Sequence, residues 1–299
     1  MDMLKITDLY KRFGDKEVLR GLNLTVPEGS IFGFIGKNGA GKTTTMKTVL
    51  GLLKADSGEI LVNGERAVYG QTSTNRHIGY LPDVPEFYAF MTAPEYLDYC
   101  GAISGMSKTE TAIRRDELLE LVGLKDEKHR VKGFSRGMKQ RLGIAQALLN
   151  RPKLLICDEP TSALDPVGRK EILDILLAVC QQTTVLFSTH ILSDVERICT
   201  DVAFLDHGVA DMQGSLAQIK AHFRREEYTL ETETDSDTAT LMRNFPSMTQ
   251  CGRNTLVFCE ESCSVFEVMT FAADKRIRLV RLERVEPTLE SLFMEVTRT

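Results

Sequence analysis

The chain has 299 residues, of which 42% are hydrophobic and 26% charged, and its formal net charge is −5 at pH 7. This balance is typical of a globular protein with room for two domains and excludes a disordered chain. No apolar run approaches the roughly 18 to 20 residues that span a bilayer, and no signal peptide opens the chain. The basic residues are scattered, which argues against nucleic-acid binding, and seven cysteines, an odd number, suit a reducing compartment. We therefore expect a cytoplasmic protein that has no membrane span of its own.

The N-terminal residues predict two layers of β structure. Hydrophobic and polar residues alternate near Leu4–Ile6 and from Val18 to Val26, which indicates strands of an antiparallel layer. The apolar run Ile31–Ile35 follows and indicates a buried strand that opens an α/β core. The expected fold is therefore α/β with an added antiparallel β layer.

A phosphate-binding motif follows the buried strand. Residues 36–43 read Gly-Lys-Asn-Gly-Ala-Gly-Lys-Thr, match the P-loop pattern GxxxxGK(S/T) and lead into a helical pattern through Leu50, an order that disfavours a chance glycine turn. The glycines let backbone N–H groups wrap a phosphate, and the helix N-terminus adds partial positive charge. Lys42 is predicted to reach the β- and γ-phosphates, Thr43 to ligate Mg²⁺, and Thr44 to bond a phosphate oxygen. The predicted nucleotide-binding residues of this loop are Gly36, Lys37, Asn38, Gly39, Ala40, Gly41, Lys42, Thr43 and Thr44.

The stretch from about residue 83 to 150 predicts a helical subdomain. Helical periodicity runs through residues 94–103, 108–122 and 138–149. Ser135 is a preferred N-cap residue, and Gly137 leaves the following amides accessible, so the positive end of the last helix points outward and would suit an anion.

Two later apolar runs end in residues whose side chains could bind a metal or take part in catalysis. Four apolar residues precede Asp158 and Glu159, and this pattern predicts a buried strand that presents two carboxylates where ligands bind in open α/β sheets. Asp158 would hold Mg²⁺ and Glu159 would act as general base; the alternative is a solvated acidic turn before Pro160. The strand pattern Val185–Thr189 delivers His190, which is either structural or catalytic.

Residues 1 to about 218 resemble the nucleotide-binding subunit of an ATP-binding cassette (ABC) transporter. The resemblance rests on six motifs in the family's order, which are Phe13, the P-loop, the signature-like segment Phe134–Arg141, the Asp158–Glu159 pair, the D-loop-like stretch Ser162–Asp165, and His190. The implied fold is a P-loop NTPase core of the ABC ATPase type with an antiparallel β layer and a helical subdomain.

The resemblance implies roles for residues that the residue pattern alone leaves open. Phe13 would stack on adenine, or it is only a core aromatic of the first hairpin. In the signature, Ser135, Arg136 and Gly137 would read the γ-phosphate of an ATP held by the other subunit. Asp165 would cross the dimer interface, and His190 would contact the γ-phosphate and the attacking water.

The chain departs from the family at two places. The commonest signature is Leu-Ser-Gly-Gly-Gln, whereas this chain has Phe134, Arg136 and Met138. The Q-loop glutamine that follows the strand Ile78–Leu81 is replaced by Asp83, which would approach Mg²⁺ or its waters, or would only form a turn.

The function implied by the resemblance is ATP hydrolysis that drives a separate integral-membrane permease. ATP and Mg²⁺ are the implied ligands, and two cassettes, identical or not, would close head to tail around two ATP. The chain would lie at the inner face of the cell membrane and contact the membrane only through the permease. The aromatic loop Phe87–Met91 would contact the permease; the alternative is that this loop packs into the local core. The tail and the signature variant favour export, but the cargo cannot be identified. The alternatives are a soluble cassette ATPase that acts on ribosomes or DNA, and an ATP-dependent regulator.

Residues 219–299 predict a second, α+β domain. Strands are expected at residues 227–233, 247–251, 255–259 and 277–285, and helices at 237–244 and 265–273. The order β-α-β-β-α-β suggests a small ferredoxin-like domain with a role in interaction or regulation. A closing helix from Pro287 would present Leu289, Leu292, Phe293 and Val296 on one face. Cys251, Cys259 and Cys263 lack the spacing of a metal site, and none is expected.

Overall fold

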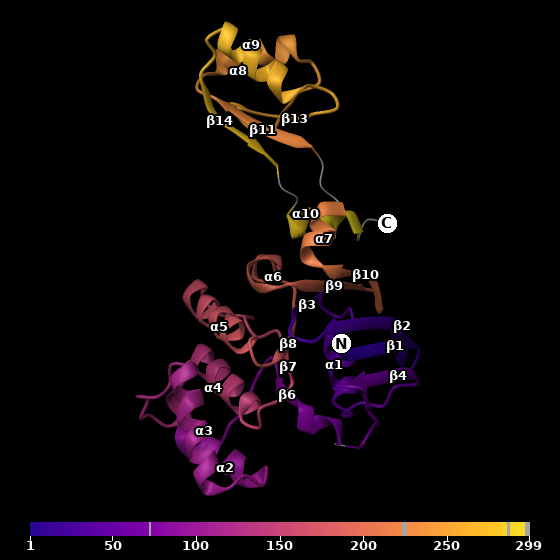
Figure 1. Cartoon of the computed structure of the whole chain (residues 1–299), viewed down its shortest axis with the longest axis vertical. Helices are drawn as coiled ribbons and strands as arrows, with labels where there is room; N and C mark the ends of the chain where they lie inside the picture. The colour runs from indigo at the N-terminus through magenta and orange to yellow at the C-terminus, as the bar shows by residue number, and fades with distance from the viewer. Residues whose placement is uncertain (72, 223–225, 286–287, 297–299) are drawn as a thin grey trace. The chain divides into compact units, whose positions relative to one another are not determined.

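The computed structural model describes residues 1–71, 73–222, 226–285 and 288–296. The chain divides into two compact units, one that runs from Met1 to Ala217 and one that begins at Gln218 (Figure 1). Each unit contains a hydrophobic core of its own.

The central sheet of the first unit has six strands in the order β10-β9-β3-β8-β7-β6. In chain order they are β3 (Ile31–Gly36), β6 (Ile78–Leu81), β7 (Leu154–Asp158), β8 (Thr184–Thr189), β9 (Asp201–Asp206) and β10 (Val209–Ser215). All neighbours pair in parallel except β9 and β10, which form an antiparallel hairpin. Every residue of β3, β7 and β8 is buried, as their apolar sequences predict for strands covered on both faces. The carboxyl ends of these three strands therefore deliver Gly36, Asp158 and Thr189 to one edge of the sheet.

The expected antiparallel layer is present as a four-stranded sheet in the order β2-β1-β4-β5. Its strands are β1 (Asp2–Phe13), β2 (Lys16–Pro27), β4 (Ser57–Val62) and β5 (Glu65–Arg66). Alternating residues of β1 and β2, such as Leu4 and Leu24, belong to one buried cluster with Phe32 and Phe34 of β3. This shared core fixes the β1–β2 hairpin beside the strand that carries the P-loop.

Three helices of the first unit follow strands of the central sheet. They are α1 (Lys42–Val49) after β3, α5 (Pro166–Val179) after β7, and α6 (Leu192–Ile198) after β8. A fourth helix, α7 (Leu216–His222), follows β10.

A helical subdomain lies between β6 and β7, as its periodicity predicts (Figure 1). It contains α2 (Ala93–Ile103), α3 (Lys108–Leu121) and α4 (Arg136–Leu148), with a short 3-10 turn at Val131–Gly133 before α4. Another 3-10 turn, Thr74–His77, precedes β6 and lies outside this subdomain. Side-chain caps begin all three helices, and Thr92 and Glu95 form a complete capping box at α2. α4 begins two residues earlier than the periodicity indicates because Ser135 accepts a hydrogen bond from the backbone N–H of Met138 at 3.2 Å.

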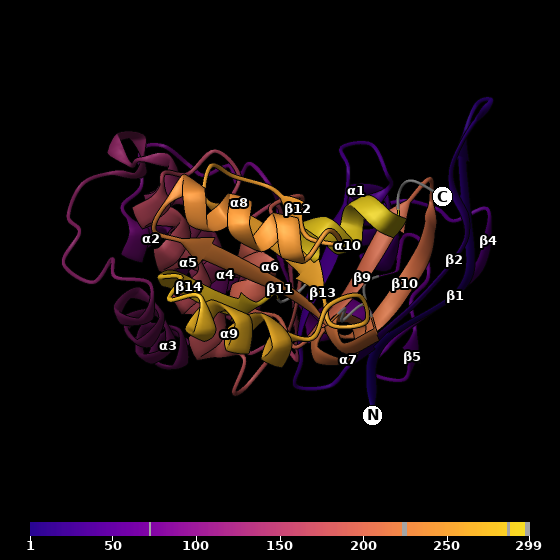
Figure 2. The ribbon, with the colours of Figure 1, turned by 90° about the horizontal axis from the view of Figure 1, so that it is seen from above.

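The second unit holds a four-stranded antiparallel sheet in the order β12-β13-β11-β14. Its elements are β11 (Glu227–Thr232), α8 (Asp235–Asn244), β12 (Thr249–Gln250), β13 (Thr255–Cys259), α9 (Val265–Asp274) and β14 (Leu279–Arg284). Both helices lie on the same face of the sheet (Figure 2), and Leu230, Leu256 and Val268 are fully buried between the layers. A last helix, α10 (Leu289–Val296), buries Leu289 and Leu292; its expected start at Pro287 and the side chains of Phe293 and Val296 lie outside the described residues.

Candidate active site

The P-loop joins β3 to α1 through glycines in left-handed conformations. Gly39 has φ 84° and Gly41, the N-cap of α1, has φ 118°. A Cβ at Gly41 would lie 2.8 Å from Leu19 Cδ2 and 3.2 Å from the carbonyl oxygen of Val18. Only glycine fits this position, and its backbone leaves the first N–H groups of α1 open to an anion.

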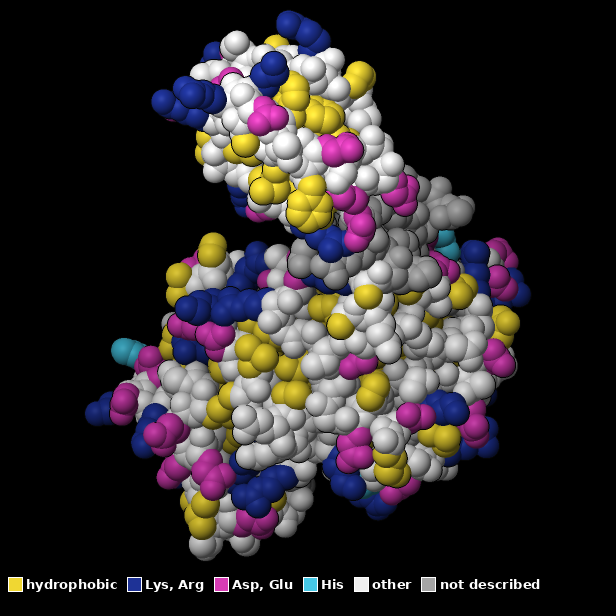
Figure 3. Space-filling model, turned by 45° about the horizontal axis from the view of Figure 1, so that its top comes forward, with side chains coloured by type: hydrophobic (Ala, Val, Ile, Leu, Met, Phe, Trp, Pro, Cys, Tyr) yellow, Lys and Arg dark blue, Asp and Glu magenta, His cyan; other side chains and the backbone are white. Residues whose placement is uncertain are grey.

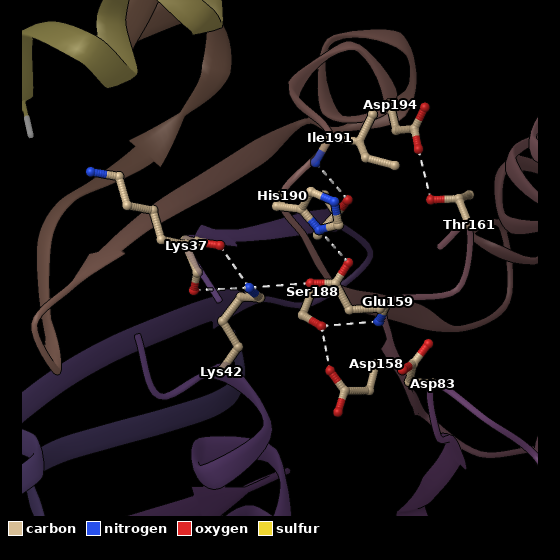
Figure 4. A network of polar contacts seen from close by, with 12 residues as sticks. Lys37, Lys42, Asp83, Asp158, Glu159, Thr161, Ser188, His190, Ile191 and Asp194 are labelled. Carbon is tan, nitrogen blue, oxygen red and sulfur yellow. Dashed lines mark hydrogen bonds and ion pairs between the residues drawn. The ribbon is translucent and has the colours of Figure 1, made fainter. Parts of the chain in front are cut away.

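Lys42 is held at the mouth of this loop by three oxygen atoms (Figure 4). Its Nζ donates to the carbonyl oxygens of Gly36 at 2.6 Å and Lys37 at 3.4 Å. It also lies 3.1 Å from Glu159 Oε1, and only 6% of the lysine side chain is exposed. The ammonium group is therefore placed by backbone carbonyls and neutralised by a carboxylate.

Asp158, at the end of β7, accepts hydrogen bonds from two hydroxyl groups. Thr43 Oγ1 donates to Oδ2 at 2.7 Å and Ser188 Oγ donates to Oδ1 at 2.6 Å. Burial, together with the negative charge of Asp158, raises the pKa of the neighbouring Tyr80 to about 12. A hydroxyl group and a buried carboxylate side by side are the oxygen donors that Mg²⁺ prefers, so the residues present fit this ion.

Glu159 lies between the lysine and the histidine (Figure 4). Its Oε2 is 2.9 Å from His190 Nδ1, and its backbone N–H donates to both the carbonyl oxygen and the Oγ of Ser188. Glu159 has φ 49°, a left-handed conformation that side chains rarely adopt. The carboxylate is consequently aimed across the edge of the sheet, between Lys42 and the half-exposed His190.

These groups open onto a cavity of about 330 Å³. Its lining residues are Val18, Asn38, Gly39, Gly41, Lys42, Thr43, Thr44, Asp83, Asp158 and Glu159. A second cavity of about 410 Å³ shares the P-loop residues Asn38 and Gly39 and continues past Lys37 and Ala40 to charged side chains of the β1–β2 hairpin. Phe13 lies outside both cavities; it is half exposed, with the Lys11 ammonium 5.2 Å from the centre of its ring.

The signature-like and D-loop-like residues lie outside the 330 Å³ cavity of their own chain. Ser135 caps α4, and Asp165 caps α5 by accepting from the backbone N–H of Gly168 at 3.1 Å. Arg136 pairs with Asp83 at 3.2 Å, so the residue in the Q-loop position is joined to the signature helix within one chain. Ser135, Arg136, Gly137 and Asp165 are not gathered around Lys42 and Glu159.

Comparison with known proteins decides the family. A family model for ABC transporters matches residues 19–162. The chain is 37% identical over 98% of its length to the uncharacterized ABC transporter ATP-binding protein YxlF of Bacillus subtilis, and it covers 99% of that protein. This chain belongs to the ABC transporter ATP-binding proteins. The resemblance inferred from the motifs is thereby confirmed, and the chain is an ABC ATPase that hydrolyses ATP for transport.

Two further ABC proteins extend the comparison. The bacitracin transport ATP-binding protein BcrA of Bacillus licheniformis is 37% identical over 89% of this chain and 92% of its own length. An ATP-binding cassette solved as a dimer in a post-hydrolysis state, bound to ADP and Pi, superposes with a TM-score of 0.64 at 25% identity, over 72% of this chain and 99% of that chain. The 72% of this chain that superposes is close to the share of the chain that lies in the first unit, Met1–Ala217.

Two residues that contact predicted site residues of this ABC ATPase were not singled out by the sequence analysis. Ser188 contacts both Asp158 and Glu159, and its only sequence signal is a hydroxyl residue near the end of an apolar strand. Gln140 is fully buried, and its Nε2 donates to the carbonyl oxygen of Asp83 at 2.7 Å. A buried glutamine within the signature helix could have been suspected, but its partner could not.

Within the four described stretches, none of the helices has the length and apolarity that crossing a bilayer requires. The same stretches contain no cluster of three or more His, Cys, Asp or Glu side chains placed to hold a metal, and the seven cysteines are free thiols. On the face seen in Figure 3, Lys and Arg side chains are interspersed with Asp and Glu.

Proposed function

We propose that this ABC ATPase powers a separate membrane permease for export and that Glu159 is its general base. The observation that carries the base assignment is the position of the Glu159 carboxylate, which lies 3.1 Å from Lys42 Nζ and 2.9 Å from His190 Nδ1 beside the Asp158–Thr43 pair. Bacitracin transport and linearmycin resistance, named for relatives 37% and 30% identical, support export.

The chain's own residues divide the work of hydrolysis. The P-loop amides and Lys42 bind the β- and γ-phosphates. Phosphate oxygens then replace the Glu159 carboxylate as the partner of the lysine. Glu159 then accepts a proton from the attacking water, and His190 holds the carboxylate in place through Nδ1. When Mg²⁺ is bound it neutralises phosphate charge, and Thr43, Asp158 and Asp83 are the residues that would hold it.

The active site is proposed to be completed by a second cassette. Ser135, Arg136 and Gly137 lie outside the cavity of their own chain, and the chain has a single P-loop. The N-terminus of α4, capped by Ser135, would instead bind the γ-phosphate of an ATP held by the partner cassette. Asp165, at the start of α5, would contact the same interface.

The permease is proposed to dock on the aromatic loop before α2. Phe87 and Tyr88 of this loop contact Tyr96 of α2, and Tyr88 also contacts Tyr99 of α2. All four rings line a cavity of about 740 Å³, and Tyr88 and Phe90 remain about half exposed or more. Such exposed aromatic residues are typical of protein contact surfaces. Docking there would hold the chain at the inner face of the membrane.

The C-terminal domain, residues 219–299, is proposed to be ferredoxin-like and to serve interaction or regulation. The β-α-β-β-α-β order, the strand order β12-β13-β11-β14 and two helices on one face support this assignment. Phe266, Met269 and Val280 are exposed on this unit, and hydrophobic side chains are visible on its surface in Figure 3.

Subunit mixing tests the composite site. Lys42→Ala disables the P-loop and Ser135→Arg disables the signature, so each variant alone should lose almost all ATPase activity. A mixed dimer regains one intact site, and the mixture should therefore hydrolyse ATP well above either variant. A mixture no more active than its parts, or a fully active Ser135→Arg variant, would contradict a site shared between two chains.

A further inference from the structure

A buried carboxylate joins the segments that follow Glu159, Asp165 and His190. Asp194, near the start of α6, is 3% exposed. Its Oδ2 accepts a hydrogen bond from Thr161 Oγ1 at 2.7 Å (Figure 4). Its Oδ1 pairs with Arg169 Nη2 at 2.6 Å. Both oxygens are thus occupied by groups from other segments, as a buried carboxylate requires.

The hydrogen bond to Thr161 supports a strained turn. Glu159 has φ 49° and Ala163 has φ 53°, so two residues with side chains hold left-handed conformations within one short turn. Such conformations persist only where the surrounding structure fixes them. Thr161 lies between the two, is 1% exposed, and is anchored through its hydroxyl to Asp194. The anchored residue therefore lies two positions after Glu159, inside the turn from which the Glu159 side chain extends.

The same residue closes the turn after His190. The backbone N–H of Asp194 donates to the carbonyl oxygen of Ile191 at 3.2 Å, and the N–H of Ile191 donates to Thr189 Oγ1 at 2.9 Å. Asp194 is thus hydrogen-bonded both to Thr161, two residues after Glu159, and to Ile191, the residue after His190, while the side chains of Glu159 and His190 meet at 2.9 Å.

We propose that the Asp194 side chain is a positioning group for ATP hydrolysis, acting through Thr161 on the turn that carries Glu159 and thereby on the contact between Glu159 and His190. The inference rests on the proposed role of Glu159 as general base. Arg169 compensates the buried charge and extends the connection to α5, the helix that Asp165 caps.

Kinetics of isosteric variants test the proposal. Asp194→Asn and Thr161→Val should lower kcat by about 10- to 100-fold, because a small misplacement of a catalytic group has effects of this size. The ATP dissociation constant, measured by calorimetry, should stay within about twofold, because the P-loop binds the phosphates independently. Asp174→Asn is the matched control, since Asp174 pairs with Arg197 at 2.9 Å between the same two helices but on the surface; its kcat should equal that of the unchanged chain.

The decisive comparison repeats both variants in a Glu159→Gln chain. With the base removed, Asp194→Asn should lower the residual turnover no further, because the two residues act as one unit. An equal fold-loss in both backgrounds, or an ATP affinity that falls in step with kcat, would overturn the proposal and leave Asp194 a structural residue. If Asp194→Asn does not fold, Thr161→Val decides by the same criteria. Unchanged turnover in Glu159→Gln alone would refute the base assignment itself and, with it, this inference.

Discussion

Lys42 and Glu159 form an ion pair of 3.1 Å whose side chains are only 6% and 13% exposed. The group proposed to bind the phosphates and the group proposed to activate water therefore neutralise each other (Figure 4). A triphosphate bound in the P-loop would compete with Glu159 for the lysine, while the contact of the carboxylate with His190 could persist. Substrate binding and exposure of the base are thus coupled through one side chain.

Removal of the base should separate binding from turnover. Glu159→Gln keeps the size of the side chain and should slow steady-state ATP hydrolysis by about 10²- to 10⁴-fold, the usual effect of losing a general base. ATP affinity, measured by calorimetry, should be retained because the P-loop is unchanged. Near-normal turnover in this variant would assign the base to another residue.

Removal of the P-loop lysine should abolish nucleotide binding. Lys42→Ala takes away the only buried ammonium group that lines the 330 Å³ cavity in the described part of the chain. Lys47→Ala is the control, since Lys47 is exposed in the last turn of the same helix. Calorimetry should find no ATP binding in the first variant and unchanged affinity in the second. Equal affinities in the two would contradict the phosphate-binding role.

The hydroxyl of Ser188 should support both fold and site. Ser188→Ala removes a hydrogen bond to the buried Asp158 carboxylate and an acceptor for the Glu159 N–H. We expect the free energy of unfolding to fall by about 1–3 kcal/mol in urea titrations, together with a loss of ATPase activity. Ser57→Ala, at an exposed position of β4, should change neither quantity.

Two P-loop glycines should respond differently to alanine. At Gly41, alanine must adopt φ 118° and would place its Cβ 2.8 Å from Leu19, whereas at Gly39, with φ 84°, the added Cβ meets nothing within 4 Å. Thermal unfolding should therefore show a larger loss of stability for Gly41→Ala than for Gly39→Ala. The reverse order would mean that the loop and β2 are less tightly packed than described.

Thiol labelling should follow burial. Burial, assisted by the negative charges of nearby aspartates, raises the pKa of the Cys157 and Cys199 thiols, so little thiolate forms in either at pH 8. Cys251 is exposed. Mass spectrometry after iodoacetamide treatment of the folded chain should find Cys251 modified, with Cys157 and Cys199 modified only after unfolding. Early modification of Cys157 would show that β7 opens to solvent.

Periodicity and motif order were sufficient for most of the fold. The apolar runs that contain Ile31–Ile35 and Val185–Thr189 form fully buried strands because parallel strands covered on both faces need continuous hydrophobic sequence. The bounds of individual strands were predicted less well from the sequence. The strand expected at residues 247–251 is only Thr249–Gln250, because β12 lies at the edge of its sheet and pairs only with β13.

The site could be predicted where chemistry depends on spacing along the chain. Lys42, Thr43, Asp158 and Glu159 lie in one cavity because a P-loop and an acidic strand end meet at the same sheet edge. Contacts that depend on tertiary packing were beyond this reasoning. The Arg136–Asp83 pair and the Thr161–Asp194 bond join residues 53 and 33 positions apart, with no local pattern to reveal them.

The left-handed backbone conformation of Glu159 lowers the stability of the fold at a position whose carboxylate is proposed to act in hydrolysis. A residue with a side chain is less stable in this conformation than glycine by about 1–2 kcal/mol, so glycine at this position would relax the turn while removing the carboxylate. Selection for thermostability alone could therefore favour loss of the proposed general base at this position, and stabilised variants altered here should be assayed for ATP hydrolysis.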